Sequence, residues 1–145
     1  MPPGTGDAQL TLSQRAALAG AVIVSTPQDL ALIDARKGLN MFRKVNVPLL
    51  GIIENMSHFL CTECGARHEV FGNGGARAEA AKLGVPFLGE VPLEMEIRAT
   101  SDDGTPIVAS QPDSPHAAHY QAIAEAVLQT LEHNAPKASP KIIVE

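Results

Sequence analysis

Short apolar runs alternate with helix-like segments along most of this 145-residue chain, and this alternation constrains the fold more than any other feature. Runs at 21–24, 47–53 and 87–91 are short and mostly apolar, as strands of a parallel sheet are. Segments at 27–44, 76–83 and 116–131 follow them in turn and carry apolar residues at helical spacing. The pattern predicts an α/β fold, a partial parallel sheet flanked by helices. Three strands are few, so we expect part of a larger sheet.

Turn and cap residues set the expected boundaries. Asp7 should cap a short helix that runs toward Leu18, and Thr26 should cap a helix at 27–44 with Pro27 as its first residue. The run at 21–24 should be a strand that is buried on both faces. In the last helix, we expect one stripe of Tyr120, Ile123, Ala124, Val127 and Leu131. By this interpretation, residues 1–133 form one domain, which contains one helical turn at 94–99 and a loop at 101–115. Residues 134–145 form a tail, in which 142–144 could pair as an edge strand.

The acidic charge balance excludes two classes of partner. Lys and Arg number 11 against 16 Asp and Glu, so the net charge is −5. With no basic run to neutralise phosphates, we expect no nucleic-acid partner and no membrane partner. No apolar stretch approaches the roughly 18 residues of a membrane span. Residues 1–4 do not resemble a signal peptide, and two closely spaced cysteines suggest a reducing compartment, so we expect a cytoplasmic protein.

Cys61 and Cys64 form a C-x2-C pair within the long connection at 54–75. On a loop, this spacing lets two thiolates bind one metal ion or cluster. Such sites normally need four ligands, so either a second chain supplies two more cysteines, or His58 and His68 complete a zinc site. A redox-active pair is the weaker interpretation, because the pair does not open a predicted helix.

Two glycine-rich segments and one asparagine are further candidates for ligand binding. The segment at 1–7 precedes a helix and could hold a phosphate, although a frayed terminus is the simpler interpretation. The second glycine-rich segment, at 72–75, is explained more simply as a turn before a helix. Asn55 ends a predicted strand, where ligands bind in open α/β sheets. The sequence contains no G-x-x-x-x-G-K-[ST] motif.

Four stretches taken together resemble the Mrp/ApbC family of iron–sulfur cluster carrier ATPases, which are MinD-like deviant P-loop proteins. They are MPPGTGD at 1–7, VSTPQDLALIDARKGLNMF at 24–42, GIIENMSHFLC at 51–61 followed by Cys64, and FGNGGA at 71–76. The resemblance implies a homodimer that holds a labile 4Fe–4S cluster between its subunits, with Cys61 and Cys64 of each as ligands. Its implied partners are apo iron–sulfur proteins that receive the cluster.

The resemblance also implies a nucleotide site. The segment with Gly4, Thr5, Gly6 and Asp7 matches the family's switch near the γ-phosphate and magnesium. Asn55 matches a position that contacts adenine, and Pro92 with Leu93 resembles a later loop on the base. The family's N-terminal half, with its P-loop lysines, has no counterpart in this sequence. We therefore expect the C-terminal part of such a carrier, inactive alone as an ATPase, whose strand at 21–24 lacks a neighbour and drives self-association.

Overall fold

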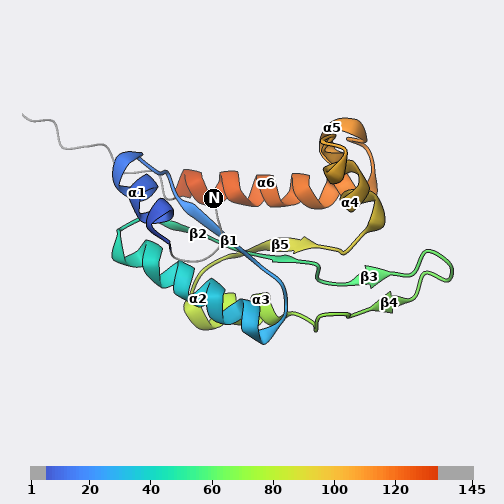
Figure 1. Ribbon diagram of the computed structural model, residues 1–145, viewed down its shortest axis with the longest axis horizontal. Helices are drawn as coiled ribbons and strands as arrows, with labels where there is room; N and C mark the ends of the chain where they lie inside the picture. Colours follow the sequence, from blue (N-terminus) through green and yellow to red (C-terminus); the bar gives the residue numbers. More distant parts are fainter. Residues whose placement is uncertain (1–5, 134–145) are drawn as a thin grey trace, which may run out of the picture.

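A parallel sheet lies between two layers of helices in the computed structural model, which describes residues 6–133 (Figure 1). Helices α2 and α3 cover one face of this sheet, and α6 covers the other. This arrangement confirms the predicted α/β fold. The strands lie in the order β1 (Ala21–Ser25), β2 (Leu49–Asn55) and β5 (Phe87–Val91), and the covering helices are α2 (Asp29–Lys44), α3 (Gly75–Leu83) and α6 (Pro115–His133).

The main core lies between α2 and the sheet. Leu39 of α2 and Ile52 of β2 are each only 1% exposed, and Leu32 and Phe42 share the buried face of the helix. Ile23 of β1 completes this contact. The helical spacing of the apolar residues in α2 therefore predicted its buried face correctly.

An ion pair joins α2 to α3 at the edge of this core. The guanidinium of Arg36 donates two hydrogen bonds to the buried carboxylate of Glu79, and the Nη2–Oε2 distance is 2.7 Å. The hydrogen bond from Arg36 lowers the pKa of Glu79. The pair consequently stabilises the fold above the pKa of an unfolded glutamate, and this contribution is lost as the pH falls through the lowered folded pKa.

The prediction that β1 is buried on both faces is wrong. Ala21 and Ile23 face α2 and are buried, but Val24 is 59% exposed. The reason is that α6 packs on β5 and β2 and leaves this side of β1 uncovered. Within the described residues, β1 pairs with β2 alone and forms an edge of the sheet.

Several element boundaries differ from the predicted ones. Strand β2 starts after Val47, whose N–H bonds to the carbonyl of Phe42 in the exit turn from α2. Helix α2 begins at Asp29 with Gln28 as its N-cap, so Thr26 does not cap it. The first helix, α1 (Asp7–Arg15), has Gly6 as its N-cap, so Asp7 is its first residue and not its cap, and the helix ends before Leu18.

The region between β5 and α6 contains more helix than predicted. Helix α4 (Met95–Asp102) exceeds the single expected turn, and α5 (Ile107–Ser110) lies within the expected loop, anchored by buried Ile107. In α6, Ile123 is buried as expected, whereas Ala124 faces solvent. No helix within residues 6–133 combines the length and the apolar character that crossing a membrane requires. The expected tail at 134–145 lies outside the described residues.

Candidate functional site

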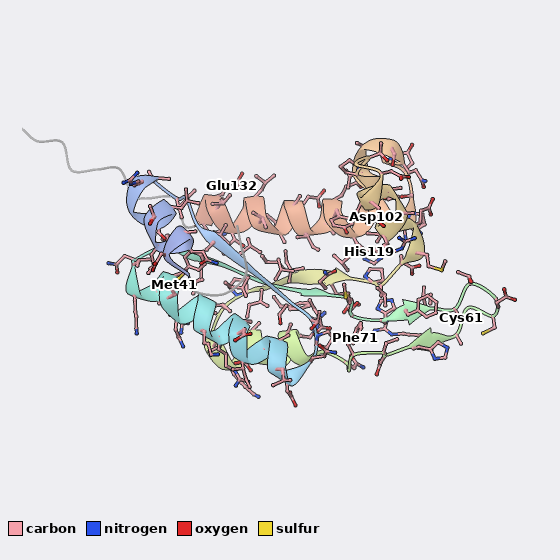
Figure 2. The ribbon with its side chains drawn as sticks, in the orientation of Figure 1. Met41, Cys61, Phe71, Asp102, His119 and Glu132 are labelled. Carbon is pink, nitrogen blue, oxygen red and sulfur yellow. The ribbon has the colours of Figure 1, made fainter. Side chains whose placement is uncertain are left out.

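The two cysteines lie at the tip of a β-hairpin that projects beyond the parallel sheet (Figures 1 and 2). Its strands are β3 (Phe59–Leu60) and β4 (Arg67–His68), paired antiparallel. The sequence predicted only a long connection at 54–75, so this hairpin is an addition to the prediction. Two strands of two residues each are too short for a periodic pattern to reveal them.

A tight turn holds the cysteine pair. Gly65 donates its N–H to the carbonyl of Cys61 at 2.8 Å, and Cys61 donates its own N–H to Ala66 at 2.9 Å. Gly65 has a φ of +69°, a conformation that suits glycine. Both thiols are free, with Cys64 exposed and Cys61 half-buried. The turn therefore presents two accessible sulfur atoms from neighbouring positions.

The surroundings of Cys61 favour its thiolate. The backbone N–H of Cys64, followed by that of Glu63 and the Cys64 thiol, lowers the pKa of the Cys61 thiol. The thiolate is the form of cysteine that binds metals. The pair thus fits half of the four-thiolate ligand set that an iron–sulfur cluster requires.

The alternative zinc site with His58 and His68 is not assembled. Among residues 6–133, no three His, Cys, Asp or Glu side chains gather closely enough to hold a metal ion. His58 is buried at the root of the hairpin, where its Nδ1 lies 2.9 Å from Ser57 Oγ, and burial lowers its pKa. His68 is exposed and lies against Phe59, with 6.4 Å between the ring centroids.

The hairpin root is bonded to the loop after β5. Ser57 donates its N–H to the carbonyl of Val91 at 3.1 Å, and Leu93 donates its N–H to the carbonyl of His58 at 2.7 Å. This connection fixes Pro92 and Leu93 beside the start of the hairpin. Sequence reasoning missed Ser57, because a single buried serine leaves no pattern.

Asn55 lies next to the same loop. It is the last residue of β2, and it is the register partner of Val91 in β5. Its side-chain Oδ1 accepts the N–H of Met56 at 3.0 Å. The structure thus brings Asn55, Pro92 and Leu93 together at the carboxyl edge of the sheet, where ligands bind in open α/β folds.

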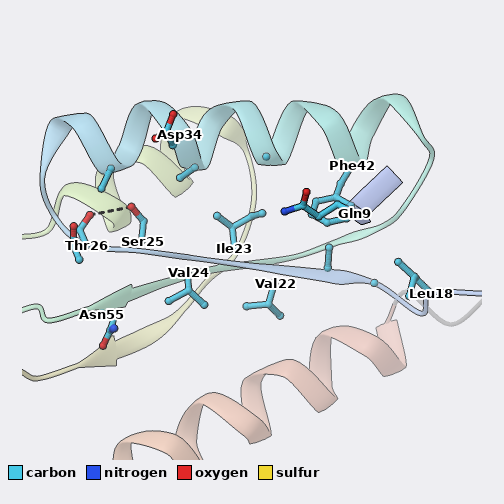
Figure 3. Close-up of a pocket in the computed structure, with 15 residues that line it drawn as sticks. Gln9, Leu18, Val22, Ile23, Val24, Ser25, Thr26, Asp34, Phe42 and Asn55 are labelled. Atoms are coloured by element: carbon cyan, nitrogen blue, oxygen red, sulfur yellow. Dashed lines mark hydrogen bonds between the residues drawn. The ribbon is translucent and has the colours of Figure 1, made fainter. Parts of the chain in front are cut away.

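The glycine-rich segment does not join this group. Gly6 is the N-cap of α1 and Asp7 is its first residue, and Figure 1 places α1 beside the opposite end of the sheet, where β1 begins. Gly4 and Thr5 lie outside the described residues. A groove of about 720 Å³ runs along β1 beneath α2, with Gln9 of α1 and Asn55 near opposite ends (Figure 3). Within residues 6–133, Gly6 and Asp7 therefore lie apart from the group that Asn55, Pro92 and Leu93 form.

Comparisons with solved structures define the class of the protein. A nucleotide-binding protein from Archaeoglobus fulgidus, in complex with ADP and with cobalt found, superposes with a TM-score of 0.67 and 40% identity. The superposition covers 79% of this chain and 46% of that one. The cell division ATPase MinD of Pyrococcus furiosus gives a TM-score of 0.60 at 22% identity, over 77% of this chain and 43% of its own. The fold is that of a MinD-like P-loop NTPase.

Sequence comparison then identifies the family. The profile of a ParA-type family described as NUBPL iron-transfer P-loop NTPase matches residues 1–128, so the chain belongs to that family. This confirms the resemblance found in the sequence. The iron–sulfur cluster transfer protein NUBPL of Dictyostelium discoideum is 52% identical over 99% of this chain. The iron–sulfur cluster carrier protein of Pseudomonas fragi is 55% identical over 86% of it.

The match covers only part of each relative. The chain spans 46% of the Dictyostelium protein and 43% of the Pseudomonas protein. It thus spans about half the length of the curated relatives that it matches.

Proposed function

We propose that this chain carries an iron–sulfur cluster as its cargo and transfers it to apo iron–sulfur proteins. The observation that supports this function best is the pair of free thiols at the projecting hairpin tip. A 4Fe–4S cluster takes four thiolates, and each chain offers two, so two copies would hold one cluster between them. The names of the relatives, which are cluster carrier and transfer proteins, support the same cargo.

Reconstitution of the purified chain with iron and sulfide tests this function. We expect about two iron atoms per chain, a brown protein and a dimer in sedimentation, as a shared 4Fe–4S cluster requires. Transfer is measured by mixing the loaded protein with an apo-ferredoxin and following the acceptor's own absorbance. One metal ion per colourless monomer would contradict the proposal and would favour a zinc-binding module instead.

The nucleotide part of the proposal is limited to the base-side edge. We propose that Asn55, Pro92 and Leu93 contact the adenine base of a bound ATP in the complete family architecture.

The cytoplasmic location of the protein stays a prediction.

ATP hydrolysis by the purified 145-residue chain should be undetectable. Phosphoryl transfer depends on positioning the phosphates and neutralising their charge, and the sequence has no Walker A lysine for this task. A phosphate-release assay with and without magnesium measures this directly. Turnover that requires magnesium and survives repeated purification would overturn the expectation.

A further inference from the structure

Glu54 is a buried carboxylate that the proposed function leaves without a role. It lies one residue before the end of β2, and it is only 1% exposed. Its Oε2 atom accepts the backbone N–H of Ala76 at 2.7 Å, and Ala76 is itself fully buried. Burying a carboxylate costs free energy unless it is hydrogen-bonded, and an apolar side chain would fill the same space without that cost. The carboxylate of Glu54 therefore has a role other than filling the core.

The contact supplies what the start of α3 lacks. The N-cap of this helix is Gly74, which has no side chain and adopts a left-handed φ of 64°. The first N–H groups of a helix need acceptors from outside it, and the helix dipole favours a negative charge there. Glu54 therefore acts as an N-cap that comes from a neighbouring strand rather than from the adjacent sequence.

The same contact closes the base of the cysteine hairpin. The chain leaves the sheet after Glu54, forms the hairpin and returns at the start of α3, so a single hydrogen bond joins its two roots. The returning root passes close to the loop after β1, because a Cβ atom added to Gly75 would lie only 2.4 Å from the carbonyl oxygen of Pro27. The outgoing root is bonded to the loop after β5 through His58 and Leu93.

We infer that Glu54 is a positioning residue that fixes the cysteine hairpin against the sheet, so that the thiol pairs of two copies meet on one cluster. This inference rests on the proposed function. The turn at 61–66 keeps its own hydrogen bonds, so the two thiols of one chain stay together without Glu54. Glu54 sets where that pair points.

Three variants separate positioning from general stability. Glu54→Met keeps the side-chain volume but removes the acceptor, Glu54→Gln restores an acceptor without the charge, and Glu79→Met removes the buried carboxylate that pairs with Arg36. Each variant is measured at the same interval below its own melting temperature. Any remaining difference in hydrogen exchange or iron loading between the variants then reflects the position of the hairpin and not the overall stability of the fold.

Hydrogen exchange is the first measurement, and it needs no cluster. In Glu54→Met, amides at 56–60 and 67–76 should exchange about tenfold faster than in the unchanged chain, because the bond that joins the roots is lost. Glu54→Gln should exchange within about twofold of the unchanged chain, and Glu79→Met should accelerate α2 and α3 but not the hairpin. Unchanged hairpin exchange in Glu54→Met would overturn the inference.

Iron loading is the second measurement. Glu54→Met should lose most of its bound iron while both thiols still react with a thiol reagent, and Glu54→Gln and Glu79→Met should load normally. Full iron loading of Glu54→Met would show that cluster binding does not depend on the positioning of the hairpin by Glu54. If the unchanged chain itself binds no iron, the proposed function fails, and hydrogen exchange alone decides whether Glu54 fixes the hairpin.

Discussion

Replacing either Cys61 or Cys64 by alanine should abolish iron and sulfide loading, the largest effect that we expect from a single substitution. Each thiolate is one of four ligands to a shared cluster, and alanine offers no donor in its place. Because each ligand occurs twice in a dimer, one substitution removes two of the four. Iron and sulfide are assayed per chain after reconstitution and removal of unbound metal.

Neighbouring positions supply the controls for this experiment. Thr62→Ala changes the same turn without removing a thiol, and His68→Ala removes the exposed ring beside Phe59. Both variants should load nearly as much iron as the unchanged chain. Full loading in both single cysteine variants would show that the ligands are elsewhere, and loss of iron in His68→Ala would favour the zinc interpretation.

A chain with both cysteines changed to serine should still form dimers or larger assemblies. Strand β1 is an edge strand, and the N–H of Ala21 bonds to Pro48 on the side of β2. By alternation, the backbone groups of Val22 and Val24 are directed to the free edge, beside the groove under α2. Unpaired strand edges with apolar neighbours associate, and a second copy can offer the same edge. Sedimentation at micromolar concentration measures the assembly.

One added charge should separate this association from the cluster-bridged one. Val24→Lys places a lysine on the exposed edge strand, a feature that blocks edge-to-edge pairing, and should give a monomer of about 15.2 kDa in the cysteine-free chain. Val108→Lys makes the same change at an exposed valine in α5 and should leave the assembly unchanged. If the cysteine-free chain alone sediments as a single monomer, β1 is not an association edge.

The parallel sheet could be predicted from the sequence because its strands are apolar and its helices are periodic. Strand β5 lies at 87–91, as expected, and Gly84 ends α3 in a left-handed conformation. The exposure of Val24 could not be predicted, since apolar residues alone do not show which faces of the sheet α6 reaches. Tertiary packing decided this point, as it did for exposed Ala124.

The candidate site was partly predictable for a similar reason. The spacing of Cys61 and Cys64 is local, so it is visible in the sequence, and the glycine that follows them fits the tight turn. The bond between Glu54 and Ala76 joins residues that are 22 positions apart, and no local pattern indicates it. The separation of Asp7 from Asn55 depends on where α1 packs, which the sequence does not specify.

The exposed hairpin tip also determines how vulnerable its cargo would be. Cys64 faces solvent, Cys61 is half-buried, and the tip projects away from the sheet, so the thiol pair is open to solvent on at least one side. An acceptor protein can reach such a cluster by direct contact while the sheet stays closed. Dissolved oxygen and small chelators would have the same access in the proposed loaded state, so we expect the loaded protein to be short-lived in air.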